Sequence, residues 1–123
     1  MKVLIVFGTR PEAIKMAPVV CELKKTLDVR VCVTAQHREM LDQVLKIFKI
    51  SPKWDLNLMK PNQDIVSLTS KIFSNLNKVL DQYNPDIVLI HGDTITTFAA
   101  ASVCFLKNIK IGHVEAGLRT GDI

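Results

Sequence analysis

Val3-Leu4-Ile5-Val6-Phe7-Gly8 is the stretch that decides the fold of this chain of 123 residues. Five apolar residues follow one another without polar alternation and end at a glycine, which is typical of a strand buried on both faces of a parallel sheet. Thr9 then offers a helix cap, and Pro11 stands where the first turn of a helix tolerates proline. The opening of the chain therefore predicts a buried strand that leads directly into a helix.

Strand and helix patterns alternate along the rest of the chain. Strands are expected over 3–7, 29–34, 54–58, 87–91 and 110–114. Helices are expected over 11–26, from the polar junction 35–37 to Ser51-Pro52, over 64–83, and after residue 94. Because Pro18 has no N–H to donate to the preceding turn, a bend or restart of the first helix is expected near Met16 and Ala17. The alternation predicts a mostly parallel, Rossmann-like α/β sheet with helices on both faces and the strand order 3-2-1-4-5.

Composition and charge narrow the possible functions. With 48% apolar residues and no biased tract or linker, residues 1–123 are expected to form one globular unit. The net charge of +4 is spread along the chain, which argues against nucleic acid as a partner and mildly favours an anionic small molecule.

Apolar runs and cysteines bear on the compartment. The longest apolar runs have about five residues, against the roughly 20 that cross a bilayer, and the apolar start is too short for a signal peptide. Cys21, Cys32 and Cys104 are odd in number and lack CxxC spacing, so buried, reduced thiols are expected. These observations predict a cytoplasmic protein without a membrane segment.

Polar residues collect just after the predicted strands, where open parallel sheets bind their ligands. The first cluster joins Gly8 and the start of a helix to Arg10 and Lys15. Exposed N–H groups, the helix dipole and two cations suit a phosphate or another acidic group, although a tight turn with solvated charges explains the pattern equally well. Only Gly8 is available there, so neither a GxGxxG nor a Walker loop is present, and no dinucleotide or ATP is implied.

Two further clusters carry carboxylates. Asp93 follows the strand at 87–91, where its carboxylate either has a role in a functional site or caps the next helix. His91 and Asp93 lack an evident third ligand, so no metal is expected. Glu115 follows the last strand and is a candidate acid or base, the alternative being a salt bridge to Arg10 or Arg119. His91 and His113, each taken singly, fit a structural role better than a catalytic one.

Four motifs together carry a resemblance to a known family. They are FGTRPEAIKMAP at 7–18, TAQHREMLDQVL at 34–45, HGDT at 91–94 and GHVEAGLRT at 112–120. In these motifs the chain resembles the non-hydrolysing UDP-N-acetylglucosamine 2-epimerases. That resemblance implies part of the N-terminal domain of a two-domain fold like that of the GT-B glycosyltransferases, with the C-terminal UDP-binding domain absent from this chain. It also implies a homodimer in the full-length family and a role in cell-surface polysaccharide biosynthesis.

The resemblance further implies a reaction and its residues. UDP-N-acetylglucosamine and UDP-N-acetylmannosamine interconvert by elimination and re-addition of UDP through 2-acetamidoglucal, without a cofactor. Matching positions implied as catalytic are Asp93, Glu115, Lys15 and Arg10, and those implied to bind the substrate are Arg10, Lys15, His113 and Arg119. Gln36 and His37 match residues that contact a second UDP-N-acetylglucosamine, an allosteric activator, in bacterial members.

Two other functions compete with this interpretation. One is a GT-B glycosyltransferase, which shares the fold and the nucleotide-sugar leaving group, and the other is a non-catalytic module that binds nucleotide sugars. For the chain alone, we expect no epimerase activity, weak binding of UDP at most, and self-association through an exposed strand at 110–114.

Overall fold

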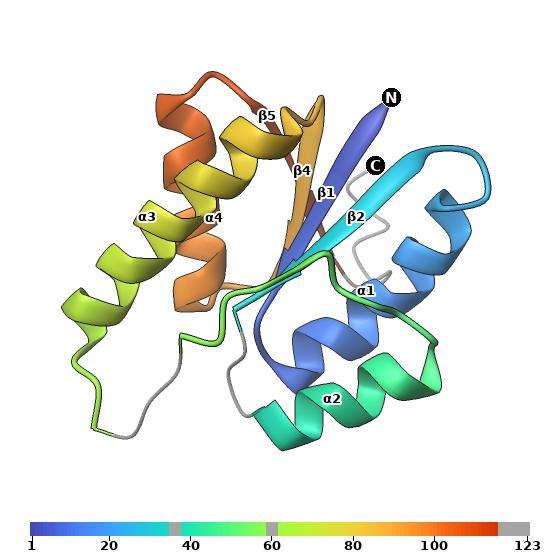
Figure 1. The fold of residues 1–123 in the computed structure, drawn as a ribbon, viewed down its shortest axis with the longest axis horizontal. Coiled ribbons are helices and arrows are strands. Elements are labelled where there is room, and N and C mark those ends of the chain that lie inside the picture. Colours follow the sequence, from blue (N-terminus) through green and yellow to red (C-terminus); the bar gives the residue numbers. More distant parts are fainter. Residues whose placement is uncertain (35–37, 59–61, 116–123) are drawn as a thin grey trace.

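The computed structural model describes residues 1–34, 38–58 and 62–115. Strands and helices alternate from the first residue of the sheet to the last (Figure 1). The elements are β1 (Lys2–Phe7), α1 (Arg10–Leu23), β2 (Asp28–Val33), α2 (Arg38–Ile47), β3 (Trp54–Asp55), α3 (Ile65–Tyr83), β4 (Ile87–His91), α4 (Ile95–Leu106) and β5 (Lys110–Val114). None of the helices in these described ranges is both long and apolar enough to cross a membrane.

All five strands form one parallel sheet in the order β3-β2-β1-β4-β5, which confirms the predicted architecture and strand order. Ile5, in the middle of β1, lies opposite Val31 of β2 on one side and Leu89 of β4 on the other. The central strand is buried on both faces, as the unbroken apolar run at the start of the chain predicts.

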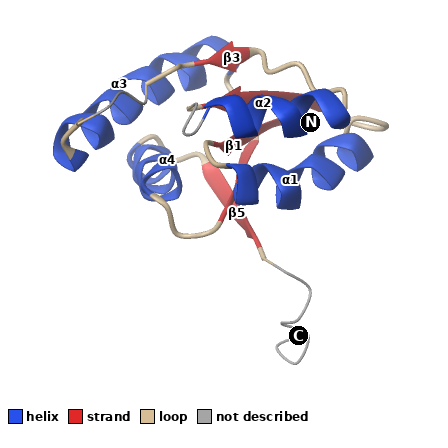
Figure 2. Ribbon diagram, turned by 90° about the horizontal axis from the view of Figure 1, so that it is seen from below, coloured by secondary structure: helices blue, strands red, loops and turns tan. Residues whose placement is uncertain are grey.

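Helices cover both faces of the sheet (Figure 2). Because successive side chains of a strand point to opposite faces, β1 divides its residues between two cores. Val3, Ile5 and Phe7 pack with α1 and α2, whereas Leu4 and Val6 pack with α3 and α4. The helix that follows β1 therefore lies on one face of the sheet, and the helix that follows the neighbouring strand β4 lies on the other face.

Two elements differ in form from those expected, and α1, β2 and α2 also differ by a few residues in their bounds. Helix α1 runs unbroken through Pro18, so the expected restart is wrong; Met16 and Ala17, directly before Pro18, are both buried against the sheet. Strand β3 has two residues rather than five. The N–H of Leu56 still donates to the carbonyl of Val33, the last residue of β2, and that of Leu58 to the carbonyl of Thr34, but Asn57 takes a φ of +49°, which breaks the regular ladder.

The three thiols are free, and two of them are buried as expected. Burial, and then the nearby carboxylate of Asp55, raise the pKa of Cys32 to about 12, and burial raises that of Cys104 to about 11. Cys21 is exposed, so the prediction is wrong for this residue. It lies one position beyond Val20, off the stripe of α1 that faces the sheet.

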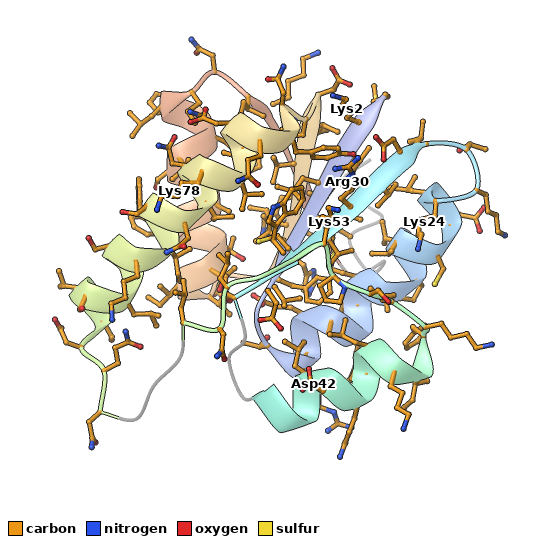
Figure 3. All side chains as sticks on the ribbon, in the orientation of Figure 1. Lys2, Lys24, Arg30, Asp42, Lys53 and Lys78 are labelled. Atoms are coloured by element: carbon orange, nitrogen blue, oxygen red, sulfur yellow. The ribbon has the colours of Figure 1, made fainter. Side chains whose placement is uncertain are left out.

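The amino-terminal rim of the sheet holds its cations against an aromatic ring. Lys2 and Arg30, both labelled in Figure 3, lie 5.6 and 4.6 Å from the ring centre of Tyr83. The Tyr83 hydroxyl donates to the Asp28 carbonyl at 2.8 Å. Burial of the hydroxyl is the main cause, and the negative charge of Asp28 the second cause, of the rise in the pKa of Tyr83 to about 12. These basic residues are thus engaged in packing at this rim.

Candidate functional site

The turn after β1 is built around a buried carboxylate. Glu12, only 3% exposed, accepts hydrogen bonds from the N–H groups of Gly8 at 2.8 Å and Thr9 at 3.1 Å. The Thr9 side chain accepts from the N–H of Glu12 in return, which completes a capping box at the start of α1. The predicted cap is confirmed, and the box fixes the direction in which α1 leaves the sheet.

The turn after β4 meets the same carboxylate. Thr94 caps α4, and its hydroxyl donates to Glu12 Oε2 at 2.5 Å. Gly92 has a φ of +83°, a left-handed conformation that favours glycine, and a Cβ there would lie 3.7 Å from Glu12 Oε2. Because Thr94 is the cap, the alternative that Asp93 caps this helix is wrong, and the Asp93 side chain lies exposed at the turn.

The turn after β5 is tied to β4 by two histidines. His113 Nε2 lies 2.8 Å from the carbonyl of Gly92, and His91 Nδ1 lies 2.5 Å from the carbonyl of Val114. Their ring centres are 6.5 Å apart. Each ring thus bonds to the backbone at the end of the neighbouring strand, and the roles expected for the two histidines stay predictions.

Glu115 is exposed rather than held at a buried strand end. Its Oε2 lies 3.4 Å from Nδ1 of His113, and its side chain is 48% exposed. The expected alternative partner was an arginine, either Arg10 or Arg119. His113 is thus one partner of Glu115; the salt bridge to an arginine stays a prediction, and Arg119 lies outside the described residues.

The predicted cations begin the helix beside this rim. Arg10 is the first residue of α1, Lys15 lies one turn further on, and both are exposed. Asp93 follows β4 and Glu115 follows β5, so all four predicted residues come after the carboxyl ends of parallel strands. Their catalytic and substrate-binding roles stay predictions. The predicted allosteric residues Gln36 and His37 lie outside the described residues.

A buried hydroxyl pair joins the fourth strand end to the same region. Thr34, directly after β2, lies 2.9 Å from Thr96 of α4, hydroxyl oxygen to hydroxyl oxygen, and both side chains are buried. Sequence reasoning missed this pair, for which the sequence holds no local signal. No role was predicted for Glu12 either, although Thr9 and Glu12 have the spacing of a capping box.

The order and direction of the strands, with helices on both faces (Figure 2), define a Rossmann-like α/β domain. In such sheets the ligand crevice lies outside the carboxyl ends of the strands, where neighbouring strands send their helices to opposite faces. Here that place is between β1 and β4, and the turns that carry Arg10 and Asp93 border it.

A family model described as UDP-N-acetylglucosamine 2-epimerase matches residues 20–123, and the chain belongs to that family. UDP-N-acetylglucosamine 2-epimerase of Neisseria meningitidis is 62% identical over 122 residues, which cover 98% of this chain and 33% of the relative. The enzyme of Escherichia coli K12 is 58% identical over 125 residues, covering 100% and 33%. The resemblance seen in the motifs is thereby confirmed, and the chain spans about a third of the length of these relatives.

Solved structures agree with the fold. The crystal structure of the Neisseria meningitidis enzyme bound to UDP-GlcNAc superposes with a TM-score of 0.89 at 61% identity, over 98% of this chain and 33% of that one. The Methanocaldococcus jannaschii enzyme in complex with UDP-GlcNAc and UDP gives 0.87 at 36% identity, over 99% and 34%. Those proteins bind a UDP-sugar.

Proposed function

We propose that this chain contributes the proton-transferring and anion-stabilising side of a UDP-N-acetylglucosamine 2-epimerase, which interconverts UDP-N-acetylglucosamine and UDP-N-acetylmannosamine. One observation carries the proposal: this chain belongs to that family and has two carboxylates and two cations after the carboxyl ends of its parallel strands. A C-terminal domain outside this chain would hold most of the UDP. A cytoplasmic location and a place in polysaccharide synthesis stay predictions.

The chemistry explains why both kinds of charge are needed. C2 of the sugar has no neighbouring carbonyl to acidify its proton, so direct abstraction is too slow. Elimination avoids this problem. A base removes the C2 proton, the electron pair forms the C1–C2 double bond, and the C1–O bond breaks with its electrons leaving on UDP. Re-addition of UDP to C1, with protonation of C2 from the other face, gives the epimer.

The four residues suit these steps. Asp93 and Glu115 are carboxylates that can accept and return a proton, and Arg10 and Lys15 can stabilise the diphosphate as it leaves. We propose His113 and Arg119 as further contacts to the substrate. The contact between His113 and Glu115 would let the ring orient that carboxylate. No redox cofactor enters the sequence of steps, because the atoms and electrons balance without one.

The test uses the full-length protein that carries this chain. Asp93→Asn and Glu115→Gln keep the size of the side chain but remove the base, so kcat should fall by about a hundredfold or more. Epimerisation is followed by separating the two UDP-sugars, and in D2O the product should carry deuterium at C2. Glu22→Gln is the control, since Glu22 is exposed near the far end of α1 and pairs with Lys25. Unchanged turnover in Asp93→Asn and Glu115→Gln would reduce them to structural residues.

We also propose a homodimer, and the outer face of α3 and α4 supports it. Phe98 of α4 is 61% exposed and lines a groove of about 510 Å³ together with Val66 and Phe73 of α3. Phe105 and Leu106 continue the exposed apolar side chains along α4. An apolar surface of this kind, shared by two parallel helices, is typical of a protein interface.

A second copy of the chain suits this groove better than a later segment of the same chain. A further strand beside β5 would be reached by a right-handed crossover, and its helix would lie next to α4 on the side away from α3. The groove between α3 and α4 would therefore stay open. Strand β5 is indeed an edge of the sheet, so its backbone offers the second route to association that the sequence predicts.

The molecular mass in solution distinguishes association through the groove of α3 and α4 from association through the edge strand β5. In the full-length protein, the double variant Val66→Ser/Phe98→Ser should shift a dimer to the monomer, measured by sedimentation. Ile47→Ser on α2 is the matched control, because Ile47 is equally exposed but lies on the other face of the sheet. A dimer that survives in the double variant would show that the α3 and α4 face does not hold it.

A further inference from the structure

Glu12 is the one buried charged side chain among the described residues. Within the same residues its carboxylate has no ion-pair partner, and it is held by hydrogen bonds alone. Taking a carboxylate out of water is costly unless several donors replace the water. A capping box alone does not require this burial, and glutamate is rarely fully buried in proteins unless it is paired. The burial of Glu12 therefore asks for a further explanation.

The two oxygens of Glu12 serve two different turns. Oε1 accepts from the backbone of Gly8 and Thr9, directly after β1, and Oε2 accepts from the hydroxyl of Thr94, directly after β4. These turns lie side by side because β1 and β4 are paired. One rigid carboxylate thus spans the place where the helices part to opposite faces of the sheet, which is the floor of the crevice in this class of fold.

Each turn also carries one charged residue of the proposed site. Arg10 comes next after Thr9, and Asp93 comes directly before Thr94. Resting on the proposed function, we infer that Glu12 is a positioning residue that sets the distance and orientation between Arg10 and Asp93. In the proposed site Arg10 stabilises the leaving diphosphate and Asp93 transfers the proton at C2, so their spacing decides whether loss of UDP and proton transfer occur together.

The donors at this point explain why a carboxylate is required. All three groups donate, and an ionised carboxylate only accepts. In Glu12→Gln the NH2 group of the amide replaces one of the two acceptor oxygens. If it faces the two backbone N–H groups, donors meet donors; if it faces Thr94, the hydroxyl can no longer donate to this side chain. Thr94→Val removes the hydroxyl altogether, whereas Thr94→Ser keeps both the hydroxyl and the helix cap.

The experiment measures the partition of the reaction in the full-length protein. Misplaced charges should let UDP leave without efficient re-addition, so Glu12→Gln and Thr94→Val should release more free UDP and 2-acetamidoglucal per epimer formed. A misplacement of about 1 Å costs up to about a hundredfold, so kcat should fall by about tenfold to a hundredfold with a smaller change in KM. Thr94→Ser should restore both the rate and the partition.

Asp64→Ala is the control for stability. Asp64 caps α3, as Thr94 caps α4, so its loss should lower the unfolding midpoint by a similar amount without changing the partition. If Glu12→Gln does not fold, the Thr94→Val and Thr94→Ser pair carries the test alone. Normal kcat and partition in Thr94→Val would overturn the inference. A wild-type protein that does not epimerise at all would overturn the proposed function, and this inference with it.

Discussion

The buried hydroxyl pair of Thr34 and Thr96 allows a double-mutant cycle with a definite outcome. The two oxygens are 2.9 Å apart, both side chains are buried, and neither has another hydrogen bond from its side chain among the described residues. Replacing one threonine by valine keeps the shape and leaves the other hydroxyl without a partner, which should cost about 2 kcal/mol of the free energy of unfolding. Replacing both removes the two polar groups together and should cost about 1 kcal/mol or less.

Urea denaturation followed by circular dichroism measures the four proteins. With an m value of about 2 kcal/mol/M, each single variant should lower the midpoint by about 1 M, and the double variant by less than either. Thr69→Val is the control, because its hydroxyl donates to the Ile65 carbonyl at an exposed position where water can replace it. It should change stability by less than about 0.5 kcal/mol. A double variant that costs about 4 kcal/mol, the sum of the single costs, would refute the pairing of the hydroxyls.

Three further predictions concern the thiols, pH and ligand binding. An alkylating reagent should modify Cys21 at once in the native chain, whereas Cys32 and Cys104 should react only on unfolding; equal rates for all three would contradict their burial. Because the pKa values of Cys32 and Cys104 are raised from 9.0 to about 12 and about 11, the unfolded state releases protons above pH 9 that the folded state keeps. Stability should be level below that pH and should fall above it by about 1.4 kcal/mol per pH unit and thiol, measured by urea titration at increasing pH. Calorimetry of the isolated chain with UDP should show weak binding at most, and low-micromolar binding would contradict the proposal that a C-terminal domain holds most of the UDP.

Elements whose signals are local could be predicted from the sequence. The strands at 87–91 and 110–114 have the bounds observed, because an apolar run lies between clear breakers such as Asn84-Pro85. Helix α3 begins directly after its predicted start, where Asp64 accepts hydrogen bonds from the first turn. The strand order followed from the alternation of elements and the handedness of their connections.

Features that depend on contacts between distant residues could not be predicted. The sequence shows that Glu12 can complete a capping box, but the hydrogen bond from Thr94 exists only because β1 and β4 are neighbours. The same holds for His113, whose bond to the Gly92 carbonyl exists only because β4 and β5 are neighbours. The location of the exposed apolar face on α3 and α4 could not be predicted either, since an apolar residue such as Phe98 gives the same sequence pattern in a core and on an interface.

The link between Glu12 and Thr94 also sets an order of events during synthesis. The two residues are 82 positions apart, and a ribosome that adds about 5–20 residues per second needs about 4–16 s to pass from one to the other. During that interval the capping box can close, because all its members lie within 8–12. The crevice cannot form during that interval, because the turn after β4, which borders its other side, has not yet been synthesised. The nascent protein thus carries Arg10 on a finished turn well before it has a binding site, and the turns that carry Arg10 and Asp93 come together only when β4 joins the sheet.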